Sequence, residues 1–171
     1  MPTLRALLGY FLASFAAAAL GGLATSRSVG TWYDTLRKPS LNPPKGVFGP
    51  VWTLLYSAMA LAAWLDWRHG RESGAGHLAL RLYWLQLGLN TLWSVVFFGL
   101  RSPALGLPII GLLWSSIAAW LVASARLDRR AALLIAPYLG WVSFASYLNL
   151  RVWQLNRGIP PVTSTDDRSG P

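Results

Sequence analysis

The segment TWYDTLRKPSLNPPKGVFGPVWTLLY, residues 31–56, decides how the rest of the chain is interpreted. It opens and closes with aromatic residues, but its middle, residues 36–45, contains Pro39, Pro43 and Pro44. Proline fixes its own backbone angle, lacks an amide donor and disfavours helix at the preceding residue. The middle is therefore predicted to be extended and stiff. Because aromatic residues flank it on both sides, we expect this loop to fold back onto the protein as a cap.

Uncharged apolar runs make up most of the remaining chain. Hydrophobic residues account for 54% of the sequence, charged residues for 12%, and the mean hydropathy is +0.40. The runs cover residues 6–24, 46–65, 82–100, 102–125 and 131–150, and each approaches or exceeds the roughly 20 residues that cross a bilayer as helix. This pattern predicts an all-α membrane protein, a five-transmembrane-helix bundle with a Pro/Trp-rich capping loop between the first and second helices.

The predicted helices lie at about 5–25, 47–67, 79–100, 103–125 and 131–153, within a single transmembrane domain over residues 1–155. Residues 156–171 are rich in Pro, Ser, Thr and Asp, a composition typical of a disordered tail.

Charge and residue usage exclude several classes of function. The net charge is +9, but the Lys and Arg residues are dispersed at the ends of the apolar runs, where they meet lipid headgroups, so nucleic-acid binding is not expected. Cysteine is absent and both histidines, His69 and His77, fall in one polar loop, so neither a metal site nor a haem with paired axial ligands is expected. Asp66 is placed at a helix end, which leaves no carboxylate in mid-membrane for ion transport.

Small residues recur at every fourth position on two of the predicted helices. In lipid, such rows allow close helix packing, either within one chain or between two copies. Both alternatives stay open, and we expect a homodimer through one of these rows: Gly9, Ala13, Ala17 and Gly21, or Gly111, Ser115, Ala119 and Ala123.

The third predicted helix carries a polar line of Gln86, Asn90 and Ser94, spaced four residues apart. Amides are costly in hydrocarbon unless they are paired, so this line is expected to face the bundle interior. It serves either to join helices by hydrogen bonds or to orient a ligand.

Tryptophan distribution favours a flat aromatic ligand. Trp32, Trp52, Trp93 and Trp141 offer broad ring faces, although packing in the core and the membrane interface is the alternative for the ten tryptophans as a group. Three cations of the loop region, Arg37, Lys38 and Lys45, are placed to meet a ligand carboxylate near the membrane surface.

Three ordered strings carry a resemblance to a known family: residues 32–56, QLGLNTLWSVVFFG at 86–99, and PYLGWVSFASYLNL at 137–150. In this order and spacing the chain resembles the TspO/MBR family, the tryptophan-rich sensory protein of bacteria and the translocator protein, or peripheral-type benzodiazepine receptor, of mitochondria. The resemblance covers about residues 4–156. It implies a five-helix bundle, often dimeric, whose first loop caps a pocket that binds porphyrins and, in mitochondrial members, sterols and synthetic drug ligands.

The resemblance also implies a set of ligand-binding residues. It assigns pocket positions to Trp32, Trp52, Asn90, Trp141, Ala145 and Leu148, with Trp93 and Phe97 near Asn90. To these we add residues that share a helix face with the tryptophans, and the position before the Pro-Pro pair where the family often has a ring: Phe48, Tyr56, Tyr138 and Leu41. A possible sterol motif, Val142, Tyr147 and Arg151, fits a loose pattern that also describes an ordinary helix end.

The expected function is the binding of tetrapyrroles such as protoporphyrin IX, and of sterols or other lipophiles, by a sensor or passive translocator that has no obligatory cofactor. The alternative is a light-dependent porphyrin-degrading enzyme that uses Trp32, Trp52 and Trp141 as electron donors. A membrane interaction protein with a vestigial pocket is the third possibility. A bacterial membrane is the expected location, with inner and outer membrane both open.

Overall fold

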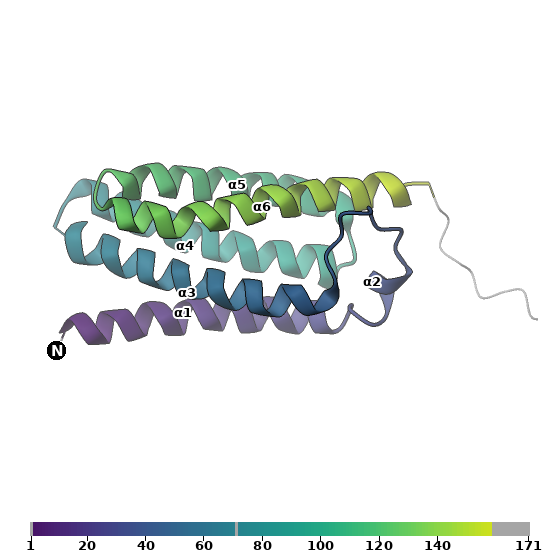
Figure 1. Cartoon of the computed structure of the whole chain (residues 1–171), viewed down its shortest axis with the longest axis horizontal. Coiled ribbons are helices and arrows are strands. Elements are labelled where there is room, and N and C mark those ends of the chain that lie inside the picture. Colours follow the sequence, from purple (N-terminus) through teal and green to yellow (C-terminus); the bar gives the residue numbers. More distant parts are fainter. Residues whose placement is uncertain (1, 71, 159–171) are drawn as a thin grey trace, which may run out of the picture.

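Long helices packed side by side form nearly the whole described chain, which comprises residues 2–70 and 72–158 of the computed structural model (Figure 1). They are α1 (Pro2–Ser26), α3 (Lys45–Gly70), α4 (Gly74–Ser94), α5 (Pro103–Ala125) and α6 (Arg129–Asn156). A π-helix, η1 (Val95–Gly99), continues α4, and one short helix, α2 (Trp32–Thr35), lies in the first loop.

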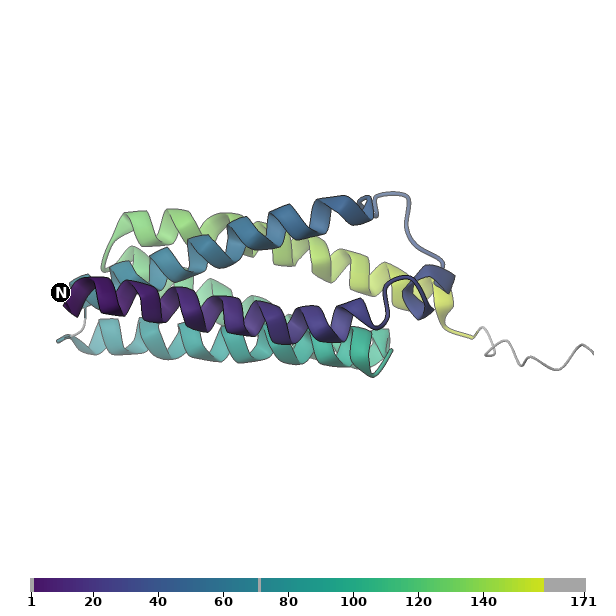
Figure 2. The same ribbon diagram turned by 90° about the horizontal axis from the view of Figure 1, so that it is seen from below.

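Helix contacts define a closed arrangement. α1 packs on α3 and α4, α3 packs on α6, and α5 packs on both α4 and α6. α3 and α4 also contact each other across the bundle. α1 also packs on η1, and in the view of Figure 2 the ribbons of α1 and α3 stand apart at the end of the bundle that carries the first loop.

Four of these helices are long and apolar enough to cross a membrane: residues Thr3–Ser26, α3, α5 and α6, with hydropathies between 1.4 and 1.9. Large leucines cover their outer surfaces, including Leu12 at 74%, Leu54 at 71% and Leu133 at 71% exposure. An apolar exterior of this extent is covered by lipid in an integral membrane protein. α4 is not among these candidate spans, because Arg81, Gln86 and Asn90 lower its mean hydropathy. Both amides are nevertheless buried in the bundle.

Helix bounds differ from the prediction mainly at the start of α4, which begins at Gly74 where residue 79 was expected. The Ser73 side chain accepts a hydrogen bond from the Gly76 amide and caps the helix. Gly76 also lies so close to Gly70 that an added Cβ would overlap its carbonyl group, and this approach shortens the connection between α3 and α4.

The carboxyl end of α6 is tied to the first loop. Asn156, which was assigned to the disordered tail, is instead the last residue of α6, and its side chain bonds the backbone N and O of Arg37 at 3.0 and 2.9 Å. The remainder of the predicted tail, residues 159–171, lies outside the described residues.

The first loop packs on the bundle through aromatic residues. Tyr33, in α2, is buried, and its ring lies 6.4 Å from Phe97 and 5.5 Å from Phe98, both in η1. Its hydroxyl group donates to Asn42 at 3.0 Å. Burial of the phenol raises the pKa of Tyr33 above its ordinary value, and the hydrogen bond to Asn42 opposes that shift. After α2 the chain becomes extended at Leu36 (φ −71°, ψ 141°), three residues before Pro39.

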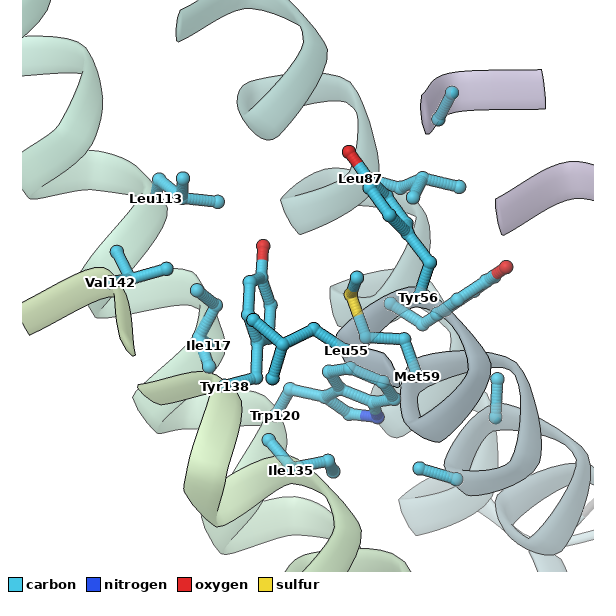
Figure 3. Close-up of a cluster of buried hydrophobic side chains, with 14 of the residues drawn as sticks. Leu55, Tyr56, Met59, Leu87, Leu113, Ile117, Trp120, Ile135, Tyr138 and Val142 are labelled. Carbon is cyan, nitrogen blue, oxygen red and sulfur yellow. The ribbon is translucent and has the colours of Figure 1, made fainter. Parts of the chain in front are cut away.

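A dry cluster of large side chains fills the bundle between α3, α5 and α6. Figure 3 shows Met59, Ile117, Trp120, Ile135 and Tyr138 meeting there, and each is fully buried. This packed cluster forms one end of the interior, and the candidate site lies toward the other end, beside the first loop.

Asp66 lies near the end of α3, as predicted, but it is buried inside the bundle and not at the interface. It is fully buried, and its Oδ2 accepts hydrogen bonds from Trp120 Nε1 and Ser124 Oγ, both at 2.8 Å. Its Oδ1 has no hydrogen-bond partner among the described residues. The sequence places Asp66 among interfacial residues, but its helix face turns toward α5, where two donors receive it.

The predicted small-residue rows have mixed environments. Ala17 and Gly21 of α1 are buried, and a Cβ at Gly21 would lie 3.1 Å from Ser94 Oγ of α4, so part of that row packs within the chain. Gly111, Ser115 and Ala119 of α5 are exposed on the outer surface. Dimerisation through the α5 row stays a prediction.

Candidate ligand-binding site

A cavity of about 640 Å³ lies between α1, α3, α4 and α6, next to the first loop. Six of the predicted ligand-binding residues line it: Phe48, Trp52, Tyr56, Asn90, Trp93 and Trp141. A volume of this size is within the roughly 300–1,000 Å³ typical of small-molecule sites.

One wall consists of aromatic rings from α3 and α6. Phe48, Trp52 and Tyr56 recur at four-residue intervals, and this spacing brings them to one face of α3. Trp141 of α6 meets two of them nearly edge to face, with ring centroids 6.4 Å from Trp52 at 86° and 6.0 Å from Phe48 at 74°. These contacts fix the rings relative to one another while both tryptophans still line the cavity.

A hydrogen-bond chain fixes the deep end of the cavity. Tyr56 Oη donates to Asn90 Oδ1 at 2.8 Å, and Asn90 Nδ2 donates to Tyr138 Oη at 2.8 Å. Tyr138 Oη in turn donates to Gln86 Oε1 at 2.9 Å. Asn90 thereby joins α3, α4 and α6, which supports the interhelical role that the sequence allowed for its polar line.

Gln86 is the last residue of this hydrogen-bond series, and its side-chain amide makes only part of its possible hydrogen bonds. It is fully buried, and its Nε2 has no hydrogen-bond partner among the described residues. Buried amide donors of this kind are uncommon in native interiors.

The α4 wall is positioned by a second amide. Trp93 Nε1 donates to Asn149 Oδ1 at 3.0 Å, and Asn149 Nδ2 donates to the Pro103 carbonyl at 2.7 Å. Trp93 thus has its indole nitrogen satisfied inside the bundle while the residue lines the cavity. Phe97 lies behind it, with ring centroids 5.3 Å apart.

Lys45 provides the positive charge at the cavity rim. Its Nζ lies 2.6 Å from Asp34 Oδ2, which connects α3 to α2. The hydrogen bond from Lys45 is the main cause that lowers the pKa of Asp34 below its ordinary value, with the charges of Lys45 and Lys38 acting in the same direction. Lys38 itself lies over the Tyr33 ring, 4.7 Å from its centroid. Of the three cations expected to meet a ligand, Lys45 alone is among the residues that line the cavity.

The other six predicted residues lie outside the cavity lining. Leu41 is 62% exposed on the loop, and Trp32 is half-buried against Phe97, with ring centroids 6.1 Å apart. Tyr138 and Phe97 are buried behind the wall residues Trp52 and Trp93. Ala145 is half-buried and Leu148 is buried, and neither lines the cavity.

The possible sterol motif does not form one surface. Val142 is 1% exposed in the core, whereas Tyr147 is 40% exposed on the outside of α6. Arg151 is half-buried and donates to Gln154 Oε1 at 2.7 Å.

Sequence analysis missed the α1 wall. The cavity is lined there by small residues and one ring: Phe15, Ala18, Ala19, Gly21, Gly22, Thr25 and Ser26. Of these residues only Gly21 belongs to the predicted row on this helix, and that row was interpreted only as a packing surface. The available signal was that small residues on α1 would leave space opposite the large rings of α3.

The fold and the cavity together define an all-helical integral membrane protein that encloses an aromatic-walled site beside its first loop. The sequence profile of the TspO/MBR family matches residues 10–154, and the chain belongs to this family.

Named relatives agree with this assignment. The chain is 44% identical over 136 residues to the tryptophan-rich protein TspO of Chlorobaculum tepidum, covering 80% of this chain and 86% of that protein. It is 41% identical over 146 residues to the tryptophan-rich sensory protein of Cereibacter sphaeroides, covering 84% and 90% of the two chains. It is 41% identical over 128 residues to the human translocator protein, covering 74% and 76%.

Proposed function

We propose that this protein binds flat aromatic lipophiles of the tetrapyrrole class, with protoporphyrin IX as the probe ligand, and that it acts as a membrane sensor or passive translocator. The observation that carries the proposal is the cavity itself, walled by Phe48, Trp52, Trp93 and Trp141 within a lipid-facing bundle. Indole rings add roughly 0.5–1.5 kcal/mol per aromatic pair beyond the burial of apolar area. The names of its relatives, sensory protein and translocator protein, support the same class of role.

We propose further that α4 with η1 is a fifth membrane span. α4 packs between α1, α3 and α5, each of which is apolar enough to cross the bilayer. Two of the residues that lower its hydropathy, the amides Gln86 and Asn90, are buried and would not meet lipid. The third, Arg81, is exposed about two turns from the amino end of α4.

A dark titration of purified protein with protoporphyrin IX tests the proposed function. Quenching of tryptophan fluorescence and a shift of the porphyrin absorption band are both expected to saturate. Trp52→Ala and Trp141→Ala should weaken binding. Trp84→Ala is the matched control, because Trp84 is 53% exposed and does not line the cavity. Equal affinity in all four proteins would contradict the proposal.

An illumination experiment distinguishes the alternative function, light-dependent porphyrin degradation, from binding that leaves the porphyrin unchanged. If the bound porphyrin spectrum decays faster under illumination than free porphyrin, and Trp52→Phe and Trp141→Phe stop the decay, the protein is a porphyrin-degrading enzyme. Trp52 and Trp141 are the adjacent pair that line the cavity, whereas Trp32 does not. Sterol competition in the same titration tests the second ligand class.

A further inference from the structure

The cavity is open on one flank and covered at its loop end. Tyr33 is 8% exposed and Val29 is half-buried, so the loop residues that line the cavity are packed. On the flank between α1 and α3, most of the lining residues are exposed: Ala19, Gly22, Ser26, Gly49 and Thr53. The opening therefore lies between two helices rather than under the loop.

Short side chains border this opening on both helices. A Cβ added at Gly22 of α1 or at Gly49 of α3 would meet nothing within 4 Å, so both positions face open space. The two helices are in contact nearer the other end of the bundle, where Trp64 Nε1 donates to the Thr3 carbonyl at 3.2 Å. Toward the first loop, residues of both helices line the cavity, and the ribbons of α1 and α3 stand apart in the view of Figure 2.

The opening faces hydrocarbon because of what surrounds it. The two helices that border it are both long and apolar enough to span a membrane, and leucines are exposed elsewhere on their surfaces, at 59% for Leu20 and Leu23 of α1 and 71% for Leu54 of α3. Exposed leucines at this depth are covered by lipid, so a solute that reaches the opening arrives from the bilayer.

The two ends of the opening differ in chemistry. Phe15, 39% exposed, lies at the deep end and contacts the Tyr56 ring at 6.4 Å between centroids. Lys45, at the amino end of α3, lies at the loop end, where a span meets the membrane surface. An amphiphile with an apolar body and an anionic group at the headgroup level complements this arrangement.

We propose that the cavity takes its ligand sideways from the bilayer, through the opening between α1 and α3. We propose also that this ligand is a flat membrane-dissolved amphiphile whose anionic group shares the Lys45 ammonium group with Asp34. The inference rests on the proposed function and adds to it the route of access and the chemical class of the ligand. It predicts that blocking the opening changes the rates of binding more than the affinity, since a route affects both directions equally.

The absence of cysteine from the chain allows a specific block. Gly49→Cys or Gly22→Cys protein is reconstituted in phosphatidylcholine vesicles and alkylated with a bulky, membrane-permeant maleimide. Gly111→Cys is the matched control, because Gly111 lies on the outer surface of α5 and its Cβ position is also open. Stopped-flow fluorescence then measures association and dissociation of protoporphyrin IX in the dark.

Both positions line the mouth of the cavity, so the decisive quantity is the rate at which bound porphyrin dissociates and not the equilibrium affinity. Alkylation at position 49 or 22 is expected to slow dissociation several-fold or more, with the position 111 control unchanged. Rates that stay unchanged after complete alkylation would overturn the lateral route. Faster dissociation after alkylation would also overturn it, because the added group would then weaken the site without obstructing the route out of it. Absence of saturable binding by the unmodified protein would instead refute the proposed function.

Lys45→Met tests the ligand class separately. It is expected to weaken binding of protoporphyrin IX, which carries two carboxylates, by roughly twofold to fivefold, as for a partly exposed ion pair. Binding of the dimethyl ester, which lacks both charges, should not change. Lys38→Met is the control, because Lys38 contacts Tyr33 and does not line the cavity. Equal losses for acid and ester would overturn the assignment of an anionic group to Lys45.

Discussion

The indole nitrogen of Trp120 donates a 2.8 Å hydrogen bond to Oδ2 of Asp66, joining α5 to α3 inside the bundle. Ser124 Oγ, one turn further along α5, donates to the same oxygen at 2.8 Å. A buried carboxylate in a membrane protein needs such donors, and these two act as a single connection between the helices.

The loss of stability on replacing Asp66 should therefore depend on whether the new side chain still offers a hydrogen-bond acceptor. Asp66→Leu leaves the Trp120 and Ser124 donors unsatisfied and should lower the free energy of unfolding by about 2–6 kcal/mol, at about 1–3 kcal/mol for each buried group. Asp66→Asn keeps an oxygen in place and should cost less than half as much. Thermal unfolding in detergent, followed by tryptophan fluorescence, measures both, and equal losses would show that the acceptor is unimportant.

A second prediction concerns Asn90, which accepts from Tyr56 and donates to Tyr138. Asn90→Leu should destabilise the protein by about 2–4 kcal/mol and weaken porphyrin binding, since Tyr56 shares its helix face with Trp52. If Asn90 couples the two tyrosines, the effects of Tyr56→Phe and Tyr138→Phe on the free energy of unfolding should not be additive. A double-mutant cycle should give a coupling energy above about 0.5 kcal/mol, and strict additivity would contradict the coupling of the two tyrosines through Asn90.

The loop contact at Asp34 has a defined dependence on pH. Because Lys45 lowers the pKa of Asp34, the contribution of this pair to stability is fully present above the ordinary aspartate value of 3.8 and is lost as the pH falls through the lower folded value. Titration of Asp34 should therefore cause no change in porphyrin affinity between pH 5 and pH 7. A difference between wild-type protein and Asp34→Asn that varies across this range would contradict the ion pair.

Cavity residues that recur at the helical period could be predicted from sequence, because helix geometry alone decides which side chains share a face. Phe48, Trp52 and Tyr56 reach the cavity together for this reason. Leu41 and Trp32 belong to the first loop, which has no regular repeat that would assign its side chains to a face. Their positions outside the cavity lining depend on tertiary contacts, such as that between Trp32 and Phe97, which no local sequence pattern predicts.

Two further features could not be obtained from spacing. Small residues on α1 indicate close packing and open space equally well, and the position of the cavity between α1 and α3 decides between them. Asp66 lies near a helix end, where hydropathy does not distinguish an interfacial carboxylate from one received by Trp120 on a neighbouring helix.

Gly106 provides the last prediction, because it lies where α5 passes closest to the Trp93–Asn149 hydrogen bond. A Cβ at this position would lie 2.7 Å from Asn149 Oδ1 and 3.5 Å from Trp93 Nε1. Gly106→Ala should therefore displace the amide, cost about 1–3 kcal/mol of stability as overpacking does, and weaken porphyrin binding through Trp93. Gly111→Ala, on the same helix with nothing within 4 Å, should instead be neutral or stabilising by up to about 1 kcal/mol. Thermal unfolding and the porphyrin titration measure both variants. If the two alanines behaved alike, the close approach at Gly106 would not position Trp93.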